Sequence, residues 1–259
     1  MTASGDPLFE YLLRLGDNAL VLGHRLSEWC GHAPALEEDI AIANTALDFI
    51  GEAQMWLGLA GEVEGEGRDA DRLAYHRDVW DFRNLLLVEQ PNGYGSAREF
   101  GVMIVRQYLY DQCHVLLLDR LTQSSNERIA AIAEKTIREA RYHLGRSSEM
   151  VIALGDGSAE SHDRISNALT RLWPFVGEML IADAVDEAMA ESEIGPNPES
   201  LRDDYHAAVR ATLTEATLDA PEGDFAHRGG KDGVRHTEHL GHMLTQMQWL
   251  QRAYPDARW

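Results

Sequence analysis

Apolar residues recur at helical spacing along almost the whole of this chain, whereas sustained alternation of β-branched residues is nearly absent. The clearest helix covers residues 36 to 57, where steps of four and three place apolar side chains along one face. The residues of that predicted buried face are Leu36, Ile40, Ala43, Leu47, Ile50, Gln54 and Leu57. Acidic residues at 37–39 fill the first turn, where the helix dipole favours negative charge. The pattern predicts an all-α protein.

The same periodicity predicts further helices between turn signals. They are expected at about 7–30, 69–89, 97–121, 124–154, 158–173, 175–190, 200–216 and 234–253. Ser124 and Glu127 have the spacing of a capping box. We expect one domain over residues 1–259, with residues 1–6 flexible. Four long helices with a shorter element between the pairs favour a ferritin-like bundle with additional C-terminal helices, although periodicity alone fits any large helical bundle.

The charge of the chain limits the partners that it can bind. The 259 residues carry a formal charge of −20, which would repel phosphate backbones and anionic lipid surfaces. We therefore expect no binding to nucleic acid and no association with membranes. Cys30 and Cys113 stand alone, without the spacing of a metal or redox motif. The N-terminal segment lacks the features of an export signal and of a membrane span, so a cytoplasmic protein is expected.

Ferritin-like di-metal proteins take a Glu from each of two helices and a Glu-x-x-His motif from each of two others. No Glu-x-x-His occurs in this chain, and Asp48 of the 36–57 helix has Gly51 where a histidine would stand. Partial matches to this ligand pattern remain on other predicted helices. The candidates for a vestigial metal site are Asp48, Asp111, His114, Glu139 and His143.

Three interpretations of these five residues stay open. They are a degraded metal centre whose residues hydrogen-bond to one another, a working but unorthodox metal site, and exposure of one or two of the groups. We favour the degraded centre, because a two-iron site needs carboxylates from both helix pairs. The sequence thus predicts no metal, no cofactor and no catalytic residue in this chain.

Two features near the C-terminus suggest weaker alternatives. His236, His239 and His242 step by three, which suits either zinc or a helix that packs on a partner. The segment HRGGK at 227–231 offers glycines and cations to an anionic ligand such as coenzyme A, although it does not match a P-loop. Four tryptophans are candidates for an interface or for the core: Trp29, Trp56, Trp80 and Trp173.

Several segments resemble one family closely. They lie at 13–62, 67–78, 82–93, 138–157 and 235–259, and they include the blocks QPNG (90–93), RYHL (141–144) and HTEHLG (236–241). These segments are similar to the C-subunit family of the phenylacetyl-CoA epoxidases (phenylacetate-CoA oxygenases) of bacterial phenylacetate degradation. The resemblance spans nearly the whole chain.

The resemblance implies a ferritin-like subunit that has lost the di-iron centre of its relatives. Such a subunit pairs with a catalytic A subunit, which is expected to carry the di-iron centre, and a B subunit and a reductase complete the complex. The complex uses NADPH and dioxygen to convert phenylacetyl-CoA to its ring-1,2-epoxide. This chain is then expected to be a structural subunit of a monooxygenase and not itself catalytic. The alternative is an autonomous di-metal oxygenase with an unorthodox ligand set.

Overall fold

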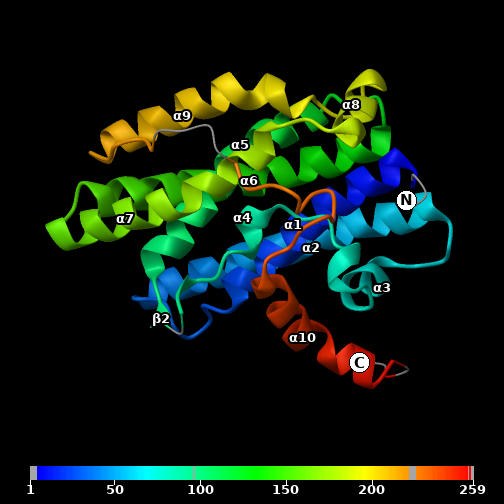
Figure 1. Cartoon of the computed structure of the whole chain (residues 1–259), viewed down its shortest axis with the longest axis horizontal. Coiled ribbons are helices and arrows are strands. Elements are labelled where there is room, and N and C mark those ends of the chain that lie inside the picture. The colour runs from blue at the N-terminus through cyan, green and yellow to red at the C-terminus, as the bar shows by residue number, and fades with distance from the viewer. Residues whose placement is uncertain (1–4, 96, 222–225, 256, 258–259) are drawn as a thin grey trace. The chain divides into compact units, whose positions relative to one another are not determined.

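The computed structural model describes residues 5–95, 97–221, 226–255 and 257, which form two compact helical units (Figure 1). Unit 1 contains Met1–Gln90 and Arg228–Trp259, and unit 2 contains Pro91–His227. The predicted all-α class is confirmed: in the part of the chain that is described, the only strands are the two-residue β1 (Gly93–Tyr94) and β2 (Ala97–Arg98). That the two units share one domain stays a prediction.

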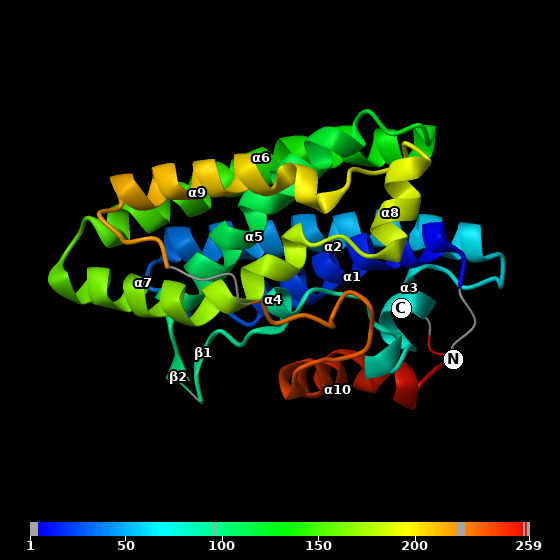
Figure 2. The same cartoon turned by 45° about the horizontal axis from the view of Figure 1, so that its top comes forward.

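Two long helices form the centre of unit 1. Helix α1 (Pro7–Ser27) and helix α2 (Leu36–Glu64) lie side by side (Figure 2). Glycines on α1 allow the close approach, because a Cβ at Gly16 would lie 2.6 Å from the Leu57 side chain and one at Gly23 would lie 3.1 Å from that of Ile50. Asp6 caps α1 by accepting the Leu8 N–H at 2.9 Å, and residues 1–4 of the segment expected to be flexible lie outside the described residues.

The predicted buried face of α2 is wrong for most of its length. Leu57 is buried, but Leu36, Ile40 and Leu47 are 70%, 54% and 68% exposed, and Gln54 is exposed as well. The face that packs inside is rotated from the predicted one and consists of Ile42, Thr45, Ala46, Phe49, Glu52, Ala53, Trp56, Leu57, Leu59 and Ala60. The helix therefore carries two apolar faces, and the periodicity identified the outer one.

The single helix predicted over 69–89 is also wrong. The structure has three short helices instead: α3 (Ala70–Tyr75), the 3₁₀ helix η1 (Val79–Asp81) and α4 (Leu86–Glu89). Polar side chains compete with the helix for backbone groups. The Arg77 guanidinium donates to the Leu73 carbonyl at 2.5 Å and pairs with the buried carboxylate of Asp17. That carboxylate also accepts the Arg83 N–H at 2.8 Å, which fixes an extended segment against α1.

Unit 2 is a second set of packed helices. Its long pair is α5 (Phe100–Leu121) and α6 (Glu127–Gly155), and α7 (Ala159–Leu172) and α9 (Arg202–Glu215) pack against this pair. The 3₁₀ helix η2 (Trp173–Leu180), α8 (Ala184–Glu191) and η3 (Pro198–Leu201) connect them. The helix predicted over 175–190 is thus divided, with a 3₁₀ helix at Pro174 and an Asp183 cap before α8.

The predicted capping box before α6 is not the one that forms. Asn126 caps the helix by accepting the N–H groups of Arg128 and Ile129 at 3.0 and 3.3 Å. Ser124 instead donates its hydroxyl to the Ile194 carbonyl at 2.7 Å, because the 192–195 turn lies beside it. The cap used is therefore the residue adjacent to the helix.

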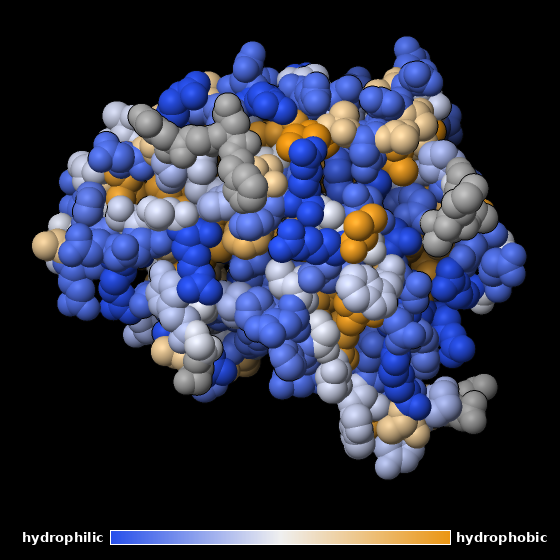
Figure 3. All heavy atoms as spheres, viewed as in Figure 1, coloured by the Kyte–Doolittle hydropathy of each residue, from blue (hydrophilic) through white to orange (hydrophobic). Residues whose placement is uncertain are grey.

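Helix α10 (Glu238–Ala253) completes unit 1 and packs on α3 and η1, at an angle to α1 and α2 (Figure 1). It begins four residues later than expected, and residues 234–237 precede it without helical structure. Hydrophilic side chains cover most of the face shown in Figure 3, where apolar ones form small patches. Among the described helices, none is long and apolar enough to cross a membrane.

Candidate functional site

The five vestigial-site candidates do not all lie together. Asp111 and His114 come from α5 and His143 from α6, and all three are buried within unit 2. Glu139 of α6 is exposed, which is one of the alternatives that its spacing left open. Asp48 lies in unit 1, half-buried on α2. Among the described residues, no group of three or more His, Cys, Asp or Glu side chains could hold a metal ion.

The Asp111 carboxylate joins the two long helices of unit 2. Its Oδ1 accepts a hydrogen bond from Gln107 Nε2 at 2.6 Å, and its Oδ2 accepts one from Ser147 Oγ at 2.8 Å. Ser147 follows His143 by one turn of α6, so the hydroxyl stands on the histidine's side of the helix. A carboxylate that is only 1% exposed needs such donors, because burial without them is costly. Both oxygens of the group therefore serve to hold the fold together.

Aromatic rings and phenols surround the same helices. The His114 ring lies 5.1 Å from that of Tyr110, between ring centroids. Tyr205 of α9 donates its hydroxyl to the Leu109 carbonyl at 3.2 Å, and burial raises the pKa of this phenol well above its usual value. Burial also raises the pKa of Tyr108 to about 12. Both phenols thus keep their protons at neutral pH, and α9 is attached to α5 through one of them.

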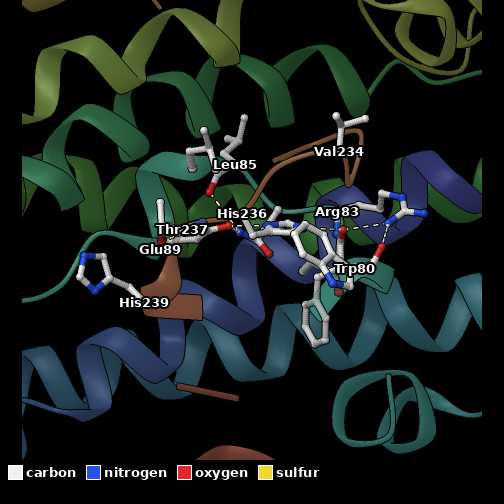
Figure 4. Close-up of polar contacts among 12 residues, drawn as sticks. Trp80, Arg83, Leu85, Glu89, Val234, His236, Thr237 and His239 are labelled. Carbon is white, nitrogen blue, oxygen red and sulfur yellow. Dashed lines mark hydrogen bonds and ion pairs between the residues drawn. The ribbon is translucent and has the colours of Figure 1, made fainter. Parts of the chain in front are cut away.

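Unit 1 contains a buried polar cluster centred on Glu89 (Figure 4). The carboxylate is fully buried and takes part in four hydrogen bonds. Oε1 accepts from Asn84 Nδ2 at 2.9 Å and lies 2.6 Å from His236 Nδ1, while Oε2 accepts from the N–H and the hydroxyl of Thr237, both at 2.7 Å. Arg25 donates to the Glu89 carbonyl at 2.8 Å and to the His239 carbonyl at 3.0 Å. We call these five side chains, Arg25, Asn84, Glu89, His236 and Thr237, the Glu89 cluster.

The three C-terminal histidines do not converge on a metal position. His236 uses both ring nitrogens, with Nδ1 on Glu89 and Nε2 at 3.2 Å from the Phe82 carbonyl. His239 lies on the other side of Glu89 and Thr237 from the His236 ring (Figure 4). His242 lies within α10, one turn after His239. Because His236 precedes α10, the spacing by three does not place the rings on one helix face, and the zinc interpretation loses its basis.

Close packing accounts for the glycines at 229, 230 and 233. A Cβ at Gly230 would lie 2.4 Å from the Asn84 carbonyl oxygen, and one at Gly233 would lie 2.3 Å from Arg83 Nη1. Gly229 and Gly233 also have positive φ angles, of 117° and 69°. The segment is therefore shaped to lie against residues 83–86, which brings His236 and Thr237 to Glu89. An anionic ligand is not needed to explain it.

Sequence reasoning missed the Glu89 cluster, because its members are separated by up to 148 positions from Glu89. A signal was nevertheless present: Glu89 directly precedes the QPNG block, and His236 and Thr237 open the HTEHLG block. The segments 82–93 and 235–259, which contain these blocks, thus meet through one carboxylate. Of the four tryptophans, Trp29 and Trp56 belong to the core, Trp173 is half-buried at the start of η2, and Trp80 is 61% exposed.

Comparison with known proteins agrees with the family resemblance. The family model described as phenylacetic acid catabolic protein matches residues 1–259. The chain is 48% identical, over 254 residues, to a curated protein of Escherichia coli (strain K12), the C subunit of 1,2-phenylacetyl-CoA epoxidase. That alignment covers 98% of this chain and 100% of the relative.

Proposed function

This chain belongs to the family of phenylacetic acid catabolic proteins, and we propose that it is a non-catalytic structural subunit of a ring-1,2-phenylacetyl-CoA epoxidase. In this role it pairs with the catalytic A subunit, which carries the di-iron centre, while a B subunit and an NADPH-dependent reductase complete the complex. The chain itself contributes no cofactor. Its 48% identity, over 98% of the chain, to a protein named as the C subunit of such an enzyme supports the assignment to the complex.

The hydrogen bonds that the buried carboxylates accept support the non-catalytic part of the proposal. Both Asp111 oxygens accept hydrogen bonds from Gln107 and Ser147, and both Glu89 oxygens are occupied by Asn84, His236 and Thr237. A carboxylate has about four lone-pair sites, and the four hydrogen bonds of Glu89 use all of them. A two-iron site needs several carboxylates that each keep a site for the metal. The other two candidate carboxylates do not complete such a ligand set, because Glu139 is exposed on α6 and Asp48 is half-buried on α2. The buried polar groups act instead as ties between segments of the fold.

Elemental analysis of iron tests this proposal. The chain is purified alone and together with the catalytic A subunit, and iron is measured per polypeptide in both samples. We expect iron only in the sample that contains the A subunit. Near-stoichiometric iron in the lone chain would instead support the alternative, an autonomous di-metal oxygenase. In that case, Asp111→Ala and His143→Ala would remove the metal.

A further inference from the structure

The outer face of α2 is an uncharged surface that stays exposed among the described residues. Leu36, Ile40 and Leu47 are among the most exposed large hydrophobic side chains of the structure. They continue along the helix in steps of four and three through Ala43, Gly51, Gln54 and Gly58. These seven residues, which we call the α2 outer stripe, extend over about 33 Å of helix at 1.5 Å per residue. Exposed apolar surface arranged in this way marks an interaction site more often than scattered residues do.

Two glycines within the stripe have no explanation in the described part of the chain. A Cβ at Gly51 or at Gly58 would meet nothing within 4 Å, and both residues lie in the interior of a 29-residue helix. Glycine in a helix interior is less favourable than alanine, because its backbone loses more freedom. The helix therefore carries a local cost at two positions where the isolated chain has room for a larger side chain.

The contact between α1 and α2 shows how glycines at such positions allow close helix packing. Gly16 and Gly23 of α1 are seven residues apart, and they receive Leu57 and Ile50 of α2, which are also seven apart. Gly51 and Gly58 repeat this spacing on the outer side. We propose that the α2 outer stripe is the docking site for a helix of a different subunit of the epoxidase, with two large apolar side chains, seven residues apart, placed over Gly51 and Gly58.

Charge selects a different subunit over a second copy of this chain. The stripe itself is uncharged, but Glu37, Glu38 and Asp39 stand at its beginning, and the last turn of α2 has no basic residue. Glu62 lies at that far end, while the neighbouring Glu64 is paired with Arg68. Two α2 helices packed through this stripe would bring acidic ends together in either direction, and each copy carries a net charge of −20. The partner helix is accordingly expected to have Lys or Arg toward its ends.

The inference rests on the proposed function, because the partner is another subunit of the same enzyme. Its test is co-purification of all the epoxidase subunits from cells that produce them together, with an affinity tag on this chain. The variant is Gly51→Ala combined with Gly58→Ala. Gly145→Ala is the matched control, since Gly145 lies within α6 and a Cβ there also meets nothing within 4 Å.

The variant and its control should agree in their effect on the Tm of the lone chain and differ in the recovery of the other subunits. Both should raise the Tm of the lone chain, by roughly 2–4 °C per substitution, because alanine favours the helix. Only the double variant should lose the other subunits, by at least tenfold in recovered amount. Leu47→Glu should lose them as well, whereas Tyr142→Glu, at a 63% exposed position of α6, should not.

Three results would overturn the inference. If wild-type and variant chains recover the other subunits equally, the stripe is not the docking site, and the proposed function is unaffected. If the wild-type chain recovers none of them, the proposed function fails and the inference fails with it. If the lone chain forms a dimer that Leu47→Glu dissociates, a second copy occupies the stripe.

Discussion

Two of the buried carboxylates, Asp111 in unit 2 and Glu89 in unit 1, accept their hydrogen bonds in different ways. Asp111 in unit 2 takes its hydrogen bonds from a residue one turn away on α5 and from the neighbouring helix α6. Glu89 in unit 1 takes one from Asn84 nearby and three from His236 and Thr237, far along the chain. One carboxylate thus joins two helices that are neighbours along the chain, while the other attaches a distant C-terminal segment to the body of its unit.

The difference shows that the surroundings of a buried acid vary with its place in the fold. Asp111 lies on the interior side of α5, and its partners include the Gln107 amide and the Ser147 hydroxyl. Glu89 lies in a short helix that no ligand motif predicted, and it takes part in four hydrogen bonds. The number and direction of the donors around a carboxylate determine its role, and these depend on tertiary structure.

Removal of the Glu89 carboxylate should have the largest effect. Glu89→Ala leaves His236, Asn84 and Thr237 buried without their acceptor, which is expected to lower the free energy of unfolding by about 3–5 kcal/mol. Chemical denaturation measures this loss, and hydrogen exchange should show residues 236–253 opening first. Glu160→Ala, at a side chain that is 80% exposed, is the control and should change stability by less than about 0.5 kcal/mol. Equal exchange in variant and wild type would show that Glu89 does not hold the C-terminal segment.

Removal of the Asp111 carboxylate should have a smaller effect, because the Gln107 amide and the Ser147 hydroxyl each lose one hydrogen bond. Asp111→Ala is expected to lower the free energy of unfolding by about 1–3 kcal/mol. His143→Ala should also lower the Tm. For both variants, the loss of stability should be larger than the loss of turnover per assembled complex. Thermal melts of the lone chain and activity of the purified complex measure the two quantities. An unchanged Tm with lost turnover would contradict a structural role for these residues.

The smallest effect concerns His24 of α1, whose Nε2 is buried without a hydrogen-bond partner among the described residues. Burial lowers the pKa of this imidazole, and the nearby Glu28 carboxylate opposes the shift only in part. Since the folded state prefers the neutral ring, this contribution to stability is complete above the unfolded-state pKa of about 6.5 and is lost as the pH falls below it. We expect denaturation midpoints to fall between pH 7 and pH 5.5, and to fall less in His24→Gln. Parallel pH profiles would exclude His24 as a cause.

Helical content was predictable because it depends on local spacing, whereas the buried face of α2 was not. Both faces of that helix carry apolar residues in steps of three and four, so periodicity cannot tell which face α1 covers. The segment 69–89 failed for another reason: Arg77 bonds to the Leu73 carbonyl and to Asp17, and these tertiary contacts override helix propensity.

The candidate site was predictable only where one helix sufficed. Asp111 was a candidate from its own helix alone, and the structure buries it on α5. The Glu89 cluster depends on contacts between residues 84–89 and 236–237, which no local pattern specifies. The sequence showed that residues 84–89 and 236–237 both lie in segments that resemble the family. It did not show that these residues contact one another.

The attachment of the C-terminal segment also fixes an order of events during synthesis. Unit 1 is built from both ends of the chain, with the whole of unit 2 inserted between them. On the ribosome, all of unit 2 therefore emerges before residues 236 and 237 are available to Glu89. Until residues 236 and 237 emerge, Glu89 lacks most of its hydrogen-bond donors. A truncated or stalled chain would therefore have an incomplete unit 1 that is more susceptible to proteolysis.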